Sequence, residues 1–298
     1  MGNPAEREIY VYLPTDYDNS SKRYPVVYVL HGATVTNAWL VGPVRNATRL
    51  LLKNGEAKEM IYVFPDATNK LVGSLYMSSI VNGDFETYIT RELVDKVDST
   101  YRTIPNRNSR AITGCSMGGM GSLHLGLKYP DIYGVVIPMN GLQLYEPFFE
   151  LTFGWGLTDF SNDYSDWSEL ASSDIAWVAS QAMIAAPNPN NPPFYFDMPY
   201  KIEKGKTIID QVVYEKMKKL TVTNDIDAYL AQPTRLNGLY IFTSDEDGEE
   251  PWPKIFTDFD SFLTSKGIPH DFTIFSGGHC DYDLSPAIKY LSDHLVFE

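Results

Sequence analysis

Residues 113–119, Thr-Gly-Cys-Ser-Met-Gly-Gly, constrain the fold of this chain more than any other stretch. They contain the pattern Gly-x-Ser-x-Gly, with Ser116 at its centre. Residues 109–113 before the pattern end in β-favouring side chains, and residues 117–128 after it carry apolar side chains at helical spacing. A strand that turns sharply into a helix strains the backbone and leaves room only for glycines beside the turn. The pattern therefore predicts that Ser116 is a nucleophile at a strand–helix turn rather than part of a structural turn.

Apolar patterns along the chain alternate between strands and helices. Continuous or alternating apolar runs predict strands at 8–13, 25–30, 60–64, 109–113, 133–138, 239–243 and 271–275. Helical spacing predicts helices near 44–53, 84–100, 117–128, 165–185, 207–220, 253–266 and 284–296. This order predicts an α/β fold in which helices cover both faces of a mostly parallel central sheet. We expect one domain, 1–298, in which residues 142–234 form a helical insertion, or cap, before the penultimate strand.

Composition excludes several classes of protein. Apolar residues make up 44% of the chain, yet no apolar run approaches the roughly 20 residues of a membrane span. The net charge of −14 argues against nucleic acid as a partner. Two cysteines without a C-x-x-C pair argue against structural zinc. The first thirty residues lack a signal pattern, so we expect a cytoplasmic protein or one whose signal has been removed. The sequence leaves open whether the protein forms a homo-oligomer.

A serine hydroxyl needs an adjacent base to become nucleophilic at neutral pH, and the base needs a third group to orient it. Among five histidines, His279 lies in Ser-Gly-Gly-His-Cys, a loop just after the last predicted strand. Loops at the carboxyl ends of parallel strands are where such folds place their chemistry. We therefore predict that His279 is the base. Of the other histidines, His124 and His294 fall on predicted helices. His270 precedes strand 271–275, and His31 lies in the turn after strand 25–30.

The third member of the triad should follow a strand that lies between the nucleophile and the base in the chain. Strand 239–243 leads into an acidic run in which Asp245 and Asp247 are the candidates, and the residues alone do not separate them. An oxyanion hole needs two N–H donors. One is expected at Met117, after the nucleophile, and the other in the loop of residues 31–34 after strand 25–30.

Nearly the whole chain resembles the esterase D and feruloyl-esterase-like branch of the α/β-hydrolases. The segments that carry the resemblance are Arg23–Gly32 followed by Trp39, Tyr101–Thr103, Gly114–Gly119, Leu127–Asp131 and Gly277–His279. The resemblance implies the α/β-hydrolase fold and a carboxylic ester hydrolase that uses a Ser-His-Asp triad, an acyl-enzyme and no metal or organic cofactor. Its Gly-x-x-Asp acid turn matches Ser244–Asp247 with serine in place of glycine, which favours Asp247. It also implies that Ala33 and Met117 are the oxyanion donors.

Two further expectations concern the cysteines and the substrate. Cys115 precedes the predicted nucleophile and Cys280 follows the predicted base, so the pair could bridge or remain two thiols. Fungal tannases and related feruloyl esterases, which this chain resembles only in these Cys-Ser and His-Cys dipeptides, join such a pair by a disulfide. We expect Trp39 and Thr34 to contact the substrate. Aromatic residues that could line an aryl-binding pocket are Trp39, Trp155, Trp167, Tyr195 and Phe196.

The family resemblance leaves the substrate open within a range of esters. It implies feruloyl or other aryl esters, or acetyl esters of plant polysaccharides, and the family also includes S-formylglutathione hydrolases and siderophore esterases. Acyl transfer to an alcohol is a rival reaction on the same fold, and a peptidase on the same triad is less favoured. A non-catalytic carbohydrate-binding homologue is the alternative from a different functional class.

Overall fold

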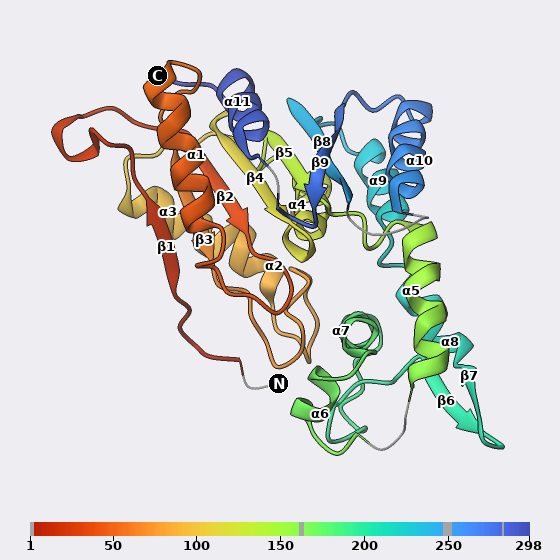
Figure 1. Cartoon of the computed structure of the whole chain (residues 1–298). Coiled ribbons are helices and arrows are strands. Elements are labelled where there is room, and N and C mark those ends of the chain that lie inside the picture. Colours follow the sequence, from red (N-terminus) through yellow and green to blue (C-terminus); the bar gives the residue numbers. More distant parts are fainter. Residues whose placement is uncertain (1–2, 161–163, 247–251, 282) are drawn as a thin grey trace.

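The computed structural model describes residues 3–160, 164–246, 252–281 and 283–298 (Figure 1). Its central sheet has the strand order β1-β3-β2-β4-β5-β8-β9 among these residues. Every neighbouring pair is parallel except β1 and β3, which are antiparallel. The strands are β1 (Ile9–Tyr12), β2 (Val26–Leu30), β3 (Ile61–Pro65), β4 (Arg110–Cys115), β5 (Val135–Met139), β8 (Gly238–Glu246) and β9 (Asp271–Gly278). The expected mostly parallel sheet is confirmed.

Helices cover both faces of this sheet. They are α1 (Val41–Asn54), α2 (Phe85–Thr87), the π-helical segment η2 (Tyr88–Glu92), α3 (Leu93–Thr100), α4 (Met117–Lys128), α10 (Trp252–Ser265) and α11 (Ser285–His294). Alternate residues of β2 belong to two separate apolar cores. Val27 and Val29 pack in the core that includes α1 and α11, whereas Tyr28 and Leu30 pack in the core that includes α3, α4 and α10. Short 3₁₀ turns occur at Tyr17–Asn19 and Arg107–Ser109.

Residues 142–234 connect β5 to β8 and contain mostly helices. Their elements are α5 (Glu146–Asp159), α6 (Trp167–Ala171), α7 (Ala176–Ala185), β6 (Tyr200–Glu203), β7 (Lys206–Ile209), α8 (Gln211–Lys218) and α9 (Val222–Ala231). The antiparallel hairpin β6–β7 corrects the helix predicted to begin at 207, since residues 207–209 belong to β7. Helices α6 and α7 lie on the side toward which the parallel strands point (Figure 1). The part of the 142–234 segment that holds α6 and α7 is thus placed beyond the carboxyl ends of the strands.

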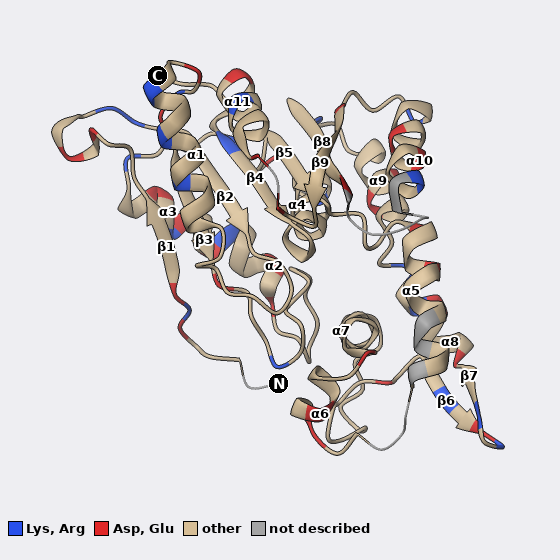
Figure 2. Ribbon diagram, viewed as in Figure 1, with Lys and Arg blue, Asp and Glu red and all other residues tan. Residues whose placement is uncertain are grey.

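Charged side chains avoid the central strands. Figure 2 shows them mainly on the helices and loops around an almost uncharged sheet, with β4 beginning at a basic residue, Arg110. Within the described residues, none of the helices has the length and apolar character that crossing a membrane requires.

Candidate active site

Ser116 lies between β4 and α4, as the motif predicts. Its backbone has φ 58° and ψ −123°, a left-handed conformation that costs a non-glycine residue energy. The Ser116 N–H donates to the carbonyl of Met139 at 3.0 Å, and its own carbonyl accepts from Met120 N–H at 2.9 Å. These bonds hold the strained residue from both sides. The serine is half-buried and lies at the carboxyl end of β4.

The glycines of the motif let the turn approach β2. A β-carbon on Gly118 would lie 2.1 Å from the carbonyl oxygen of Leu30, and one on Gly114 would lie 2.5 Å from the same atom. Both distances are far below van der Waals contact, so no side chain fits at either position. The sequence at this turn is therefore set by the close packing of β4, α4 and β2.

A disulfide joins this turn to the turn that carries His279. Cys115 and Cys280 are bonded, with their Cα atoms 6.0 Å apart, which settles the alternative that the sequence left open. Because Ser116 and His279 each adjoin one of these cysteines, their Cα atoms lie within roughly 14 Å of each other. His279 is exposed and lies in the turn directly after β9, in the position that the sequence predicted.

The other histidines are held by partners of their own. His31 accepts from Ala67 N–H, His124 pairs with Asp225, His270 Nε2 lies 3.0 Å from Asp260, and His294 Nδ1 donates to Tyr290. His270 and His294 lie in the connection before β9 and at the end of α11. His279 is therefore the histidine that the disulfide ties to the serine turn.

The two candidate acids follow β8. One carboxylate oxygen of Asp245 accepts from the backbone N–H of Gly277 at 3.1 Å, two residues before His279. This bond ties the end of β8 to the end of β9. Asp247, which the family resemblance favours, lies outside the described residues. Its assignment as the triad acid, with Asp245 as the alternative, stays a prediction.

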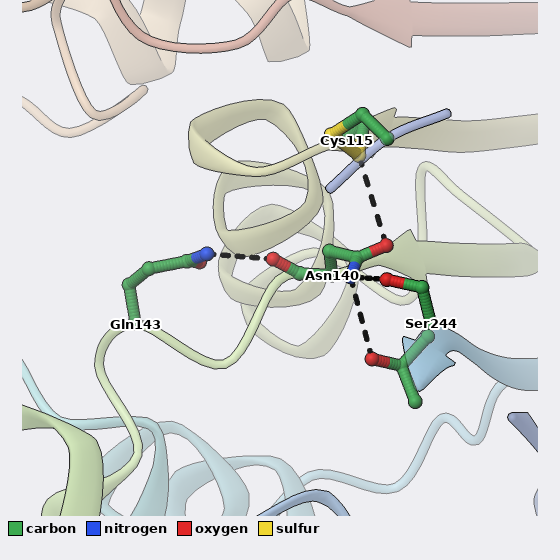
Figure 3. The surroundings of a disulfide bond; sticks show 6 residues. Cys115, Asn140, Gln143 and Ser244 are labelled. Carbon is green, nitrogen blue, oxygen red and sulfur yellow. Dashed lines mark hydrogen bonds between the residues drawn. A yellow bond between two sulfur atoms is a disulfide. The ribbon is translucent and has the colours of Figure 1, made fainter. Parts of the chain in front are cut away.

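Asn140 is a buried residue behind this site that sequence reasoning missed. It follows β5 with φ 46°, and its side-chain oxygen lies 4.0 Å from the sulfur of Cys115 (Figure 3). Its side-chain NH₂ group donates to Ser244 Oγ at 2.9 Å, and its backbone carbonyl accepts from Gln143 Nε2 at 2.6 Å. Asn140 thus connects the disulfide to the end of β8, from which the acidic run continues. A lone asparagine after a strand carries no sequence pattern that would have revealed this role.

The predicted oxyanion donors are on adjacent segments. Met117 is the first residue of α4, so its N–H has no acceptor within the helix. In the loop after β2, Thr34 N–H donates to the carbonyl of Val72 at 2.8 Å, whereas Ala33 N–H has no hydrogen bond among the described residues. The loop after β2 lies against the serine turn at Gly32, since a β-carbon on Gly32 would lie 3.6 Å from the carbonyl oxygen of Cys115. Among the residues that the structure describes, the N–H groups of Ala33 and Met117 therefore both lie without an acceptor close to the turn between β4 and α4, called the elbow below.

The segment after β3 supports the same loop, and sequence reasoning missed this too. Ala67 N–H donates to His31 Nε2 at 2.9 Å, so the proton is on Nδ1, which donates to the carbonyl of Gly32 at 2.8 Å. Burial lowers the pKa of His31, which favours this neutral form. Tyr76 is fully buried and donates to the carbonyl of His31 at 2.9 Å. These contacts fix the backbone that carries Ala33.

Trp39 is a partly exposed aromatic side chain beside the oxyanion segment. It is 36% exposed, and its ring would lie 3.1 Å from a β-carbon on Gly32. Thr34 is exposed with φ 61°. Trp167 packs against Phe194 with ring centroids 5.4 Å apart, while Phe196 is buried in the core and Tyr195 is exposed. The side chain of Trp155 lies outside the described residues.

Comparison with known proteins identifies the class of this chain. A family model described as "Putative esterase" matches residues 3–192, more than half of the sequence. The chain belongs to this esterase family. The match includes the serine turn and the oxyanion segment, which agrees with the resemblance drawn from the motifs.

Relatives and solved structures agree with this class. An esterase of Mycobacterium tuberculosis is 29% identical over 185 residues, 61% of this chain and 38% of that protein. An endo-1,4-beta-xylanase/feruloyl esterase of Xylanibacter ruminicola is 32% identical over 135 residues, 42% of this chain and 18% of that protein. The matches thus span well under half of both relatives. A ferulic acid esterase structure superposes with a TM-score of 0.65 at 21% identity, covering 97% of this chain and 93% of that one. The chain therefore has the expected α/β-hydrolase fold.

Proposed function

We propose that this chain hydrolyses carboxylic esters through an acyl-enzyme on Ser116, with His279 as base and Asp247 as the acid that orients it. The observation that carries the proposal is the joining of the strained serine turn to the His279 turn by the Cys115–Cys280 disulfide. A covalent tie between these turns keeps nucleophile and base together, as nucleophilic catalysis requires.

Acylation begins with attack of Ser116 Oγ on the ester carbonyl carbon. His279 accepts the hydroxyl proton as the C–O bond forms, and the carboxylate of Asp247 stabilises the imidazolium. The N–H groups of Ala33 and Met117 hold the negative oxygen of the tetrahedral intermediate, aided by the positive end of the α4 dipole. Collapse breaks the bond to the alcohol, which leaves with the proton from His279.

Deacylation repeats these steps with water. His279 takes a proton from water as its oxygen attacks the acyl carbon, and the second tetrahedral intermediate is held by the same two N–H groups. The carboxylic acid leaves when the bond to Ser116 Oγ breaks, and His279 returns the proton to the serine. No metal or organic cofactor takes part in this scheme.

We propose feruloyl or other aryl esters as the substrates, with acetyl esters of plant polysaccharides next. The half-exposed ring of Trp39 beside the oxyanion segment supports an aryl acyl group, because flat rings stack on one another. Two of the similar proteins are named as feruloyl or ferulic acid esterases. Thr34, exposed in the same loop, is the second predicted substrate contact.

The first test measures hydrolysis of p-nitrophenyl acetate, butyrate and octanoate and of methyl ferulate by the wild type and by Ser116→Ala. We expect the variant to lose at least ~10³-fold in kcat, the usual size of a triad effect. Ser99→Ala, which removes an exposed hydroxyl from α3, is the matched control and should keep full activity. Asp247→Asn and Asp245→Asn in parallel would identify the acid by the larger loss.

Three results would change the proposal. Activity that survives in Ser116→Ala would exclude this serine as the nucleophile. Product formation that depends on an added alcohol, with little hydrolysis, would point to acyl transfer. A wild type that cleaves nothing and is not labelled by a serine-directed phosphonate would favour a carbohydrate-binding homologue without turnover.

A further inference from the structure

A cavity lies away from the serine turn, between α4 and the 142–234 segment. Its volume is about 490 Å³, and its lining comes from α4, from the residues around α2, and from α7, α8, α9 and the turn after α8. His124, in this lining, is eight residues beyond Ser116, which is about 12 Å along a helix. The cavity is therefore separate from the elbow.

The charges around this cavity are unusual for the chain. The charged side chains in the lining are His124, Lys128, Lys216, Lys219, Glu86 and Asp225. The three lysines outnumber the two carboxylates before His124 is counted, although the whole chain has a net charge of −14. Lys128 Nζ pairs with Glu86 at 2.5 Å, whereas Lys216 and Lys219 have no ion pair with any described residue. Two exposed lysines at this cavity are therefore without a counterion in the part of the chain that the structure describes.

His124 adds a buried donor to this lining. Burial alone would lower its pKa, but the carboxylates of Asp225 and Glu86 outweigh burial and raise the pKa to about 9. The imidazole is therefore protonated at neutral pH, and Nδ1 donates to Asp225 at 2.8 Å. His124 is 8% exposed, and its Nε2 has no hydrogen-bond acceptor among the described residues. Glu86 lies 3.8 Å from Nε2, beyond hydrogen-bond distance.

We propose that this cavity binds a tetrahedral oxyanion, as free phosphate or as a phosphate monoester. The oxyanion would accept from His124 Nε2 and pair with the ammonium groups of Lys216 and Lys219. Phosphate suits these groups because it offers several strong acceptor oxygens and two negative charges. Since the lysines belong to α8 and the turn after it while His124 belongs to α4, the bound anion would tie the 142–234 segment to the helix that follows Ser116.

Titration calorimetry with inorganic phosphate and, separately, with glycerol 2-phosphate tests the proposal at pH 7 and constant ionic strength. We expect one saturable site per chain with a Kd on the order of 1 mM or below. The variant Lys216→Gln/Lys219→Gln should bind at least tenfold more weakly. Both lysines are exposed, so this variant should fold normally. Lys206→Gln, which removes an exposed lysine from β7, is the matched control and should bind like the wild type.

The affinities for the two compounds distinguish free phosphate from a monoester as the preferred form. Absence of saturable binding by either compound would overturn the proposal and leave a cavity filled with water. Binding that is equally tight in the double lysine variant would overturn it as well, since the anion would then occupy another place. Neither result depends on ester hydrolysis, so failure here is distinguishable from failure of the proposed function.

Discussion

Ser116 is held in its strained backbone conformation by hydrogen bonds and by the close packing of the turn. The residue is not a glycine, yet φ is positive, and the bonds to Met139 and Met120 hold it there. The strain is sustained by packing of the elbow against β2, where Leu30 lies against the motif glycines. Such strain is typical of a nucleophile held at the carboxyl end of a central strand.

Substitution of a motif glycine tests this account of the elbow. Gly118→Ala should lower the free energy of unfolding by at least about 2 kcal/mol, because the new β-carbon would meet Leu30 O at 2.1 Å. Gly42→Ala in α1 is the matched control: nothing lies within 4 Å of its β-carbon. That substitution should be neutral or stabilising by up to about 1 kcal/mol. Urea denaturation measures both, and equal stabilities of the two variants would refute the packing argument.

The sequence indicated where the candidate residues lie in the fold when the signal was local. The positions of Ser116 and His279 followed from a motif and from a strand end, both short-range features. The roles of His31 and Asn140 could not be predicted, because their hydrogen-bond partners lie far away in the sequence. The choice between Asp245 and Asp247 depends on side-chain placement in a run of acids, which no periodicity encodes.

At the scale of elements, the strands of the sheet and the helices that cover it lie close to where the sequence predicted them. Within residues 142–234, α5, α9 and the hairpin β6–β7 were not predicted. Buried strands such as β2 and β5 are continuous apolar runs between turn residues, so they are easy to recognise. Helix α5 has apolar residues all round together with two glycines, so it lacks an amphipathic period. The hairpin β6–β7 is short, mixes polar with apolar residues, and forms a two-stranded sheet of its own.

The disulfide between the elbow and the turn after β9 gives a prediction at this scale. Cys280→Ala should lower kcat roughly 10- to 100-fold with little change in KM, because the His279 turn would no longer be held at the serine. It should also lower the free energy of unfolding by about 3–5 kcal/mol, since the bridge closes a loop of 165 residues. Steady-state kinetics and urea denaturation measure these effects.

A double-variant cycle separates the bridge from the cysteine side chains. Cys115→Ala should cause the same losses as Cys280→Ala, and the double variant should be no worse than either, because all three lack the same bond. Additive losses would show that each cysteine acts by itself. Wild-type kinetics in the variant lacking Cys280 would show that the bridge does not position His279.

At the scale of the whole molecule, α4 joins the sheet to the 142–234 segment. The helix packs against β4 and β5 on one side and against α9 on the other. Buried in this contact, His124 pairs with Asp225 of α9 at 2.8 Å and lies 3.8 Å from Glu86 of α2. Burial would raise the pKa of Glu86, yet His124 and Lys128 hold that pKa well below its usual range. His124 and Glu86 are therefore both charged at neutral pH, and the contacts of His124 join α4 to α9 and α2.

The charged state of His124 makes the stability of the molecule depend on pH. The pKa is about 9 in the folded protein against 6.5 ordinarily, so folding favours the protonated form. This contribution, roughly 3 kcal/mol, is complete below pH 6.5 and is lost as pH rises through 9. The depressed pKa of Glu86 affects stability only in acid, outside that pH window.

We expect the free energy of unfolding of the wild type, measured in urea, to fall by roughly 3 kcal/mol between pH 6 and 9.5. In His124→Gln the fall should be absent, whereas His294→Gln in α11 should retain it. A wild-type stability that does not fall across this range would mean that the carboxylates do not hold the proton on His124, and that the cavity beside it has no buried cation.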